Sequence, residues 1–258
     1  MRNVNLKRVG IIMICLFTGA GWLQSDSRQH LFKEGNQFYI QGEFENALTA
    51  YQKIVEMGYE SGSIYYNIGN CYYKLGNIGR AILNYERAKK LIPSDEDLKA
   101  NLTIARLSVV DKIEPVSDFI VIQAMHAFFY MLPRSLQFML TLSVYVFFMA
   151  ILIFWLLTRS AFWRYVVVRL FWISGIAFIL LSISLTGRLL EEQRVVNAVI
   201  LADKVDVMSA PTEQGGIEVF SLHEGTKVRL DRSSDKWVEI VLPDRKVGWV
   251  KREVLEAI

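Results

Sequence analysis

The chain has 258 residues, room for one large domain or two small ones, and 52% of them are hydrophobic. Lys and Arg exceed Asp and Glu by only three and are scattered along the chain, which argues against nucleic acid as a partner. Two cysteines, Cys15 and Cys71, cannot make a disulfide framework, and three widely separated histidines offer no metal-ligating cluster, so we expect neither a metal nor another cofactor.

The N-terminus begins with basic residues, followed by seventeen uncharged residues at 9–25. Small residues at 18–20 stand where a signal peptidase would cleave. This layout is typical of a secretory signal, so we assign residues 1–25 to a signal peptide or, if it stays uncleaved, to an N-terminal anchor. Cys15 is a poor lipoprotein acceptor because bulky side chains precede it.

Residues 28–95 repeat with a period of thirty-four. Four pairs of small or aromatic residues carry this spacing: Gly35 and Gly69, Phe38 and Tyr72, Ala47 and Ala81, Tyr51 and Tyr85. The small residues let two helices approach closely, and the aromatic residues fill the space between neighbouring helices. The pattern resembles the tetratricopeptide repeat (TPR), which implies two helical hairpins at 28–61 and 62–95.

A further helix is predicted at 95–110, with Ser94 or Asp95 as its N-cap. We interpret it as the capping helix of a TPR module that covers 28–110. Two repeats are fewer than the three that usually suffice for stability. We therefore expect the module to depend on this cap, on the helix that precedes the membrane segments, or on a partner.

In proteins that resemble this family, the first helix of each repeat lines a concave groove. That correspondence gives seven candidate protein-binding residues: Phe32, Asn36, Tyr39, Tyr66, Asn70, Tyr73 and Lys74. Asn36 and Asn70 match the asparagines of carboxylate-clamp TPR domains, but Phe32 replaces a lysine of that clamp. The resemblance therefore favours an extended or helical protein segment as the ligand, and packing within the repeat is the alternative role for each residue.

Two long apolar stretches follow, at 136–158 and 170–187. At about 1.5 Å per residue, each is long enough to cross a hydrocarbon core of roughly 30 Å. The remaining chain is too small to cover two such helices in a soluble core, so we predict a transmembrane hairpin. The connecting loop, 159–169, carries three arginines and no acidic residue, which predicts that it is cytoplasmic and that both soluble modules are periplasmic.

The apolar segment at 119–133 is too short to span a bilayer. A narrow polar stripe at helical spacing predicts an amphipathic helix lying in the membrane interface. A helix that docks the TPR module onto the hairpin explains the same pattern.

From residue 195 the hydrophobic period changes to two, and turn-forming residues recur at intervals of about ten. Residues 195–258 resemble a bacterial SH3 domain, most specifically at Gly248-Trp249-Val250, which implies a small all-β barrel. Trp237 and Trp249 are the aromatic candidates for a shallow binding groove in it. Core packing is the alternative, and we favour it for Trp249.

The expected fold is thus multidomain, with all-α TPR hairpins, a two-helix transmembrane hairpin and a small all-β SH3-like barrel. This order of segments resembles the E-type proteins of the bacterial aerotolerance (Bat) operon. The resemblance implies a scaffold in the bacterial inner membrane that binds other membrane or periplasmic proteins, including Bat proteins, and contacts membrane lipid.

Two other functions are alternatives to a scaffold. An envelope sensor or cell-wall anchor would act through the SH3-like domain and bind cell-wall peptide. An enzyme, for instance a wall hydrolase, would need a catalytic constellation, and we find none at usable spacing in the sequence. We therefore predict a non-enzymatic protein with no catalytic residue.

Overall fold

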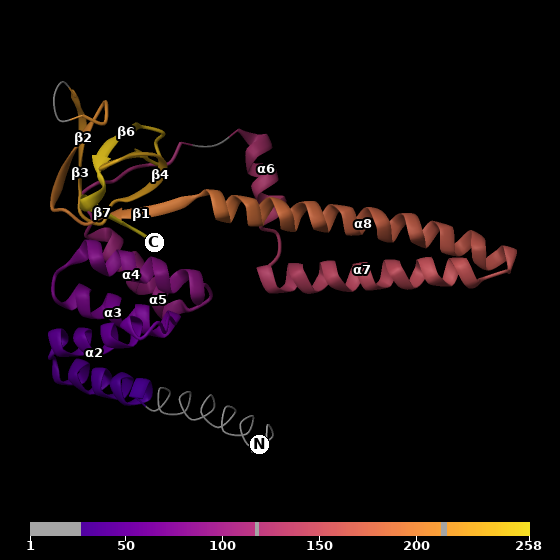
Figure 1. Cartoon of the computed structure of the whole chain (residues 1–258), viewed down its shortest axis with the longest axis horizontal. Helices are drawn as coiled ribbons and strands as arrows, with labels where there is room; N and C mark the ends of the chain where they lie inside the picture. Colours follow the sequence, from indigo (N-terminus) through magenta and orange to yellow (C-terminus); the bar gives the residue numbers. More distant parts are fainter. Residues whose placement is uncertain (1–26, 117–118, 213–215) are drawn as a thin grey trace, which may run out of the picture. The chain divides into compact units, whose positions relative to one another are not determined.

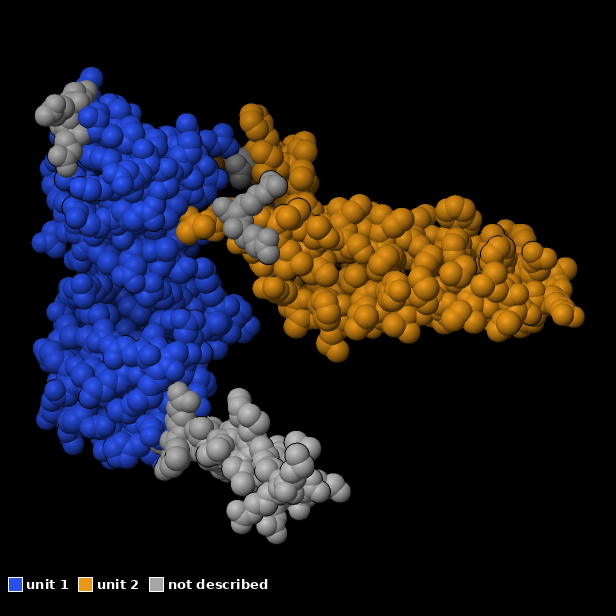
Figure 2. Space-filling view, in the orientation of Figure 1, with its two compact units in different colours: residues 1–114, 197–258 blue, residues 115–196 orange. Residues whose placement is uncertain are grey.

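The computed structural model describes residues 27–116, 119–212 and 216–258. The predicted signal segment lies outside the described residues. The chain divides into two compact units, coloured separately in Figure 2. Unit 1 comprises Met1–Glu114 together with Asn197–Ile258, and unit 2 comprises Pro115–Val196.

The TPR region of unit 1 is helical throughout (Figure 1). Residues 27–41 form its first helix, and four more helices follow: α2 (Phe44–Glu56), α3 (Gly62–Lys74), α4 (Ile78–Leu91) and α5 (Glu96–Leu107). Polar side chains cap the starts of the later helices. The Asp95 carboxylate, for example, accepts from the Leu98 N–H at 2.8 Å, which selects Asp95 from the two predicted caps of the fifth helix.

The thirty-four-residue period reflects one packing contact made twice. A Cβ atom added to Gly35 would lie 2.7 Å from the Tyr51 ring, and one added to Gly69 would lie 2.6 Å from the Tyr85 ring. Each glycine therefore admits the tyrosine of the following helix in its own repeat. Side chains at these two positions would force the helices apart.

The seven strands among the described residues of unit 1 form one sheet in the order β3-β2-β6-β5-β4-β1-β7. They are β1 (Val196–Ile200), β2 (Lys204–Met208), β3 (Glu218–His223), β4 (Lys227–Ser234), β5 (Trp237–Val241), β6 (Val247–Lys251) and β7 (Leu255–Ala257). Alternate residues such as Val207, Val238 and Ile240 are buried together on one face. The period of two in the sequence thus gives a sheet with one apolar face.

The predicted barrel is not confirmed, because the sheet is open and has β3 and β7 as its two edges. The short turns, in contrast, fall where turn-forming residues predicted them. Asp235 and Arg245 adopt positive φ angles of 49° and 68° between successive antiparallel strands.

The sheet packs directly on the TPR helices within unit 1. The apolar TPR core includes Val199 of β1, with Leu201 and Ile258 packed against it. The end of β1 and the turn before β4 both approach α4 so closely that a Cβ atom on Gly79 would lie 3.0 Å from the Ile200 carbonyl oxygen and 3.2 Å from the Gly225 nitrogen. The sheet therefore supports this two-repeat module together with the expected capping helix α5, whose Leu98, Leu102 and Ala105 lie in the same core. Support from the sheet was not expected from the sequence.

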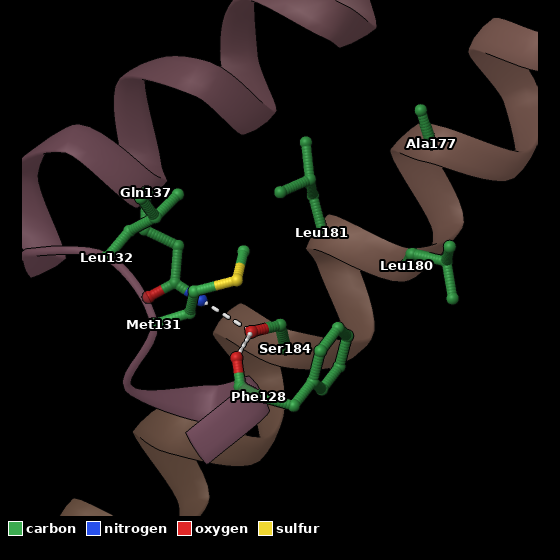
Figure 3. Close-up of a pocket in the computed structure, with 8 residues that line it drawn as sticks. All are labelled: Phe128, Met131, Leu132, Gln137, Ala177, Leu180, Leu181 and Ser184. Carbon is green, nitrogen blue, oxygen red and sulfur yellow. Dashed lines mark hydrogen bonds between the residues drawn. The ribbon is translucent and has the colours of Figure 1, made fainter. Parts of the chain in front are cut away.

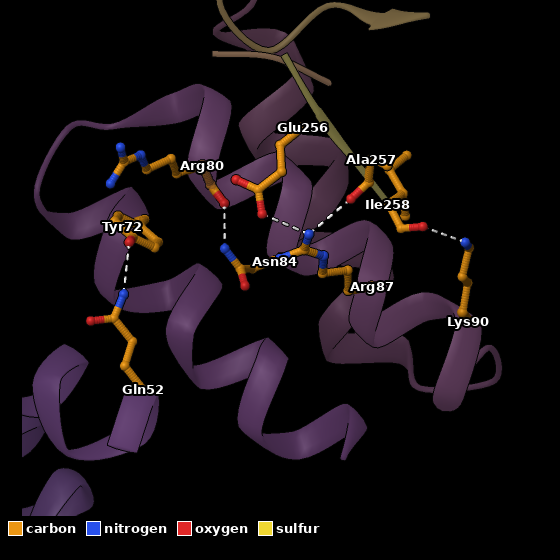
Figure 4. A network of polar contacts seen from close by, with 9 residues as sticks. All are labelled: Gln52, Tyr72, Arg80, Asn84, Arg87, Lys90, Glu256, Ala257 and Ile258. Carbon is orange, nitrogen blue, oxygen red and sulfur yellow. Dashed lines mark hydrogen bonds and ion pairs between the residues drawn. The ribbon is translucent and has the colours of Figure 1, made fainter. Parts of the chain in front are cut away.

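Charged side chains fasten the C-terminal strand to α4 (Figure 4). Arg87 donates to the Glu256 carboxylate at 2.7 Å and to the Ala257 carbonyl at 2.8 Å. Lys90 donates to the carbonyl of Ile258 at 2.6 Å.

Two acids, Glu86, which is buried, and Asp111, which is half-buried, complete the contact between helices and sheet. Glu86 of α4 accepts from Lys227 of β4 at 2.9 Å and from Arg106 of α5. Asp111 accepts from the His223 backbone N–H and from the Thr226 hydroxyl, each at 2.6 Å. Buried carboxylates need such partners to remain charged.

Unit 2 contains α6 (Ile120–Phe129), α7 (Arg134–Leu157) and α8 (Ala161–Arg194). Helices α7 and α8 are long and apolar enough to cross a membrane, and only 11% of the most apolar stretch of each is buried. They pack on each other through aromatic pairs such as Phe148 and Phe171, whose ring centroids lie 4.9 Å apart.

The connection between α7 and α8 is shorter than predicted. Residues 161–169 are the first turns of α8, and only the three residues 158–160 lie outside the helices. Continuing the helix satisfies the backbone groups of this segment internally, while long arginine side chains such as Arg164 and Arg169 can extend toward water.

Helix α6 docks on the C-terminal half of α8. His126 Nε2 lies 2.7 Å from the Glu191 carboxylate, and the Ser184 hydroxyl donates to the Phe128 carbonyl at 2.9 Å. The Arg188 guanidinium donates to the Leu132 carbonyl just beyond α6. Contact with α8 thus holds α6, although most of its side chains remain exposed.

Candidate protein-binding site

The seven predicted groove residues lie on helix 27–41 and on α3, the first helix of each repeat. Six of them form three pairs with the repeat spacing: Phe32 and Tyr66, Asn36 and Asn70, Tyr39 and Tyr73. All six are half-buried, whereas Lys74 is exposed at the end of α3. The repeat therefore presents the same three side-chain types twice.

Both asparagines are held by the tyrosine that packs on the neighbouring glycine. The Tyr51 hydroxyl donates to Asn36 Oδ1, and the Tyr85 hydroxyl donates to Asn70 Oδ1, each at 2.7 Å. Asn101 of α5 adds a second donor to Asn70 Oδ1 at 3.0 Å. Within the described residues, the Nδ2 groups of both asparagines make no hydrogen bond, so two oriented amide donors remain for a ligand.

Three of the aromatic members lie near Tyr85. Tyr66 lies 6.0 Å from Tyr85 between ring centroids, and burial, followed by the proximity of Tyr66, Tyr39 and Tyr73, raises the pKa of Tyr85. Burial also raises the pKa of Tyr39, so its phenol remains protonated at neutral pH. The result is a group of aromatic faces beside the two amide donors.

Cys71 lies in α3 among these residues but is fully buried. Burial raises the pKa of its thiol to about 12. Such a thiol behaves as a small packed side chain rather than as a nucleophile.

The two predicted tryptophans lie on β5 and β6 of the sheet, away from the TPR groove residues in the sequence. Trp249 is paired with Glu239 in register and is half-buried. It lies on the face opposite Val238 and Val250, which are buried in the sheet core. Core packing, the role that we favoured for Trp249, therefore does not describe its position.

Trp237 shares this outer face, since it is paired with Lys251, two residues beyond Trp249. The Lys251 ammonium lies 6.0 Å from the centroid of the Trp237 ring. Glu239, between the tryptophans, is bound by Arg232 at 2.7 Å. Two aromatic side chains thus flank charged groups on the outer face of the sheet.

The structure also contains a polar groove of about 350 Å³ that was not predicted from the sequence. Helices α2, α3 and α4 line it together with Glu256 of β7, and Arg80, Asn84 and Arg87 lie along one side. The spacing of these three residues marks one helix face and could have identified part of the groove. The acid from β7 could not have been assigned to it, because 169 residues separate Arg87 from Glu256.

Comparison with known proteins supports the repeats. A family model described as "Tetratricopeptide repeat" matches residues 63–95, and one described as "TPR repeat" matches residues 35–76. No curated protein matches the chain. The chain therefore contains TPR repeats, which are typical of protein-protein interaction scaffolds and are usually non-catalytic.

Proposed function

We propose that this chain is a membrane-anchored, non-enzymatic scaffold whose TPR groove holds an extended or helical segment of another protein. The observation that carries the proposal is the repeated amide pair. Asn36 and Asn70 have their oxygens fixed by Tyr51 and Tyr85 and keep their N–H donors unused within the described residues. Donors at repeat spacing suit the backbone carbonyls of a bound segment, and the neighbouring aromatic rings suit its side chains.

We further propose that α7 and α8 anchor the scaffold with unit 1 on the periplasmic side of the bacterial inner membrane. The 34 residues of α8 span about 51 Å, so both charged ends can lie beyond a hydrocarbon core of roughly 30 Å. Arg159, Arg164 and Arg169 cluster near the α7–α8 turn, which favours a cytoplasmic turn. The proposed partners are other membrane or periplasmic proteins, and the order of segments makes Bat proteins the first to test.

The groove is tested by in-cell crosslinking, detergent pull-down and mass spectrometry. The variant Tyr39→Ala/Tyr73→Ala removes one aromatic ring from each repeat but leaves the bonds between asparagine and tyrosine intact. Tyr59→Ala, which changes an exposed tyrosine between α2 and α3, is the matched control. We expect a set of partners to disappear in the double variant only, and an unchanged set would refute the groove as the binding site.

Orientation is tested separately, with single cysteines in a cysteine-free chain. Ser160→Cys reports on the α7–α8 turn, and Ser63→Cys reports on an exposed position of α3. A membrane-impermeant maleimide applied to cells with a permeabilised outer membrane should label position 63 but not position 160. The reverse pattern would place unit 1 in the cytoplasm.

A second candidate function uses the sheet. Its resemblance to a bacterial SH3 domain and the outer-face position of Trp237 and Trp249 favour binding of cell-wall peptide. Titration of the detergent-solubilised chain with muropeptides, followed by tryptophan fluorescence, should show saturation that Trp237→Ala/Trp249→Ala abolishes. No signal at millimolar ligand would exclude this function.

A further inference from the structure

Unit 2 contains an apolar pocket of about 330 Å³ where the end of α6, the start of α7 and the middle of α8 meet (Figure 3). Its walls are almost entirely hydrocarbon, from side chains such as Met131, Leu180 and Leu181. Gln137 and Ser184 are the polar residues among those that line it. The volume is at the lower end of the range for pockets that hold small molecules, about 300–1,000 Å³.

The side-chain amide of Gln137 is buried, but only one of its two polar atoms has a hydrogen-bond partner among the described residues. The residue is 2% exposed, and its Nε2 donates to the Ser184 hydroxyl at 2.8 Å. That hydroxyl in turn donates to the Phe128 carbonyl, while Oε1 of Gln137 has no hydrogen-bond partner among the described residues. Exchanging the amide nitrogen and oxygen leaves one of the two atoms unpartnered as well.

A buried acceptor without a donor is costly, and more so in hydrocarbon, where water cannot supply the donor. Figure 3 shows the amide at the wall of the pocket. The terminal torsion of a glutamine side chain is soft, so the direction of Oε1 can adjust to a donor in the pocket. The pocket therefore lacks a hydrogen-bond donor.

The charged side chains next to the pocket are paired with one another. Arg188 and Arg134 both contact Glu192, at 2.8 Å and 3.3 Å, and His126 Nε2 contacts Glu191 at 2.7 Å. Each of these basic groups faces a carboxylate, so none of them is left over to bind an anionic head group. The wall also differs from a helix-docking face, because bulky side chains rather than small ones form most of it.

We propose that this pocket binds one uncharged membrane lipid whose head group carries a hydroxyl, of the diacylglycerol type. The hydroxyl donates to Gln137 Oε1, and the beginning of an acyl chain fills the space beside Leu180 and Leu181. The inference rests on the membrane placement of α7 and α8 in the proposed function. It adds a lipid class and a site to the anchor.

The test uses the full chain in phosphatidylcholine nanodiscs after flotation with vesicles has shown insertion. The probes are a diacylglycerol with a photoreactive chain and the same molecule with its hydroxyl acetylated. Because one hydrogen bond changes affinity by roughly 3- to 10-fold, labelling of α8 peptides should be several-fold stronger with the free hydroxyl.

Three variants separate the explanations. Gln137→Leu should retain labelling but make the two probes equal, and Ala177→Phe should abolish labelling by filling the pocket. Ala150→Phe adds the same ring to an exposed position of α7 and should leave labelling unchanged.

Equal labelling of the wild type by both probes overturns the proposal, as does labelling that Ala177→Phe leaves unchanged. Insertion without labelling, together with a protein crosslink that depends on Ala177, would assign the pocket to a neighbouring helix. Failure to float with vesicles would refute the membrane placement and the lipid together, whereas insertion without labelling refutes the lipid alone.

Discussion

Replacing Glu86 by glutamine keeps the shape of a buried side chain but removes its negative charge, to which both Lys227 and Arg106 are bound. Glu86 is 4% exposed, whereas the side chains of Lys227 and Arg106 are 39% and 46% exposed and can regain water. Hydrogen bonds to charged groups contribute about 1.5–3 kcal/mol each to stability. Because water screens the exposed Lys227 and Arg106 side chains, the contribution of these two bonds is smaller. We expect Glu86→Gln to lower the free energy of unfolding of unit 1 by about 2 kcal/mol.

The assay is amide hydrogen exchange of the full chain in detergent, measured by mass spectrometry. At sites that exchange through cooperative unfolding, about 2 kcal/mol corresponds to roughly 30-fold faster exchange. The acceleration should be equal in peptides from α4 and from β4. Glu96→Gln, which neutralises an exposed acid paired with Lys99, is the control and should change exchange little.

Acceleration confined to α4 would refute the reasoning, because helices and sheet would then unfold separately. The pH dependence gives a second check. Burial alone would raise the pKa of Glu86, but Lys227 and Arg106 outweigh it and hold the pKa below its usual range. The stabilisation is therefore present at neutral pH and is lost as acid protonates the carboxylate, so the difference between wild type and variant should shrink at low pH.

Three further predictions address the packing of unit 1. Gly69→Ala places a Cβ atom 2.6 Å from the Tyr85 ring and should cost about 1–3 kcal/mol in chemical denaturation, whereas Ser63→Ala on the same helix should cost far less. Partial burial alone would raise the pKa of Asp111, but hydrogen bonds from the sheet hold the pKa of this carboxyl below its usual range. Asp111→Asn should therefore lower the thermal midpoint at neutral pH but not in acid. At pH 8, Cys71 should react with iodoacetamide roughly a thousandfold more slowly in the folded chain than in urea, as followed by peptide mass mapping, because its pKa of about 12 leaves little thiolate. Equal rates would show that α3 opens readily.

The helical half and the apolar helices could be predicted because their signals are local. Each repeat buries its glycine against a tyrosine sixteen residues later in the same hairpin, so the spacing in the sequence records the contact directly. The same holds for α7, where an unbroken apolar run is longer than a bilayer core. The sequence predicted a loop at 159–169 because arginines interrupt the apolar run there. The structure begins α8 at Ala161, since a helix tolerates arginines wherever their side chains reach water.

Contacts between distant segments could not be predicted from the sequence. Glu86 is an ordinary charged residue in the pattern of α4, and only the fold brings Lys227, 141 residues later, within 2.9 Å of it. The half-satisfied amide of Gln137 likewise depends on Ser184 and Phe128, which come from two other helices. The repeats, the apolar helices and the strand-forming segments can be predicted from the sequence, because each depends on periodic neighbours along the chain. The support of the two repeats by the sheet, and the places where buried polar groups find or lack partners, emerge only in the folded chain, because those energies depend on distances between segments far apart in the sequence.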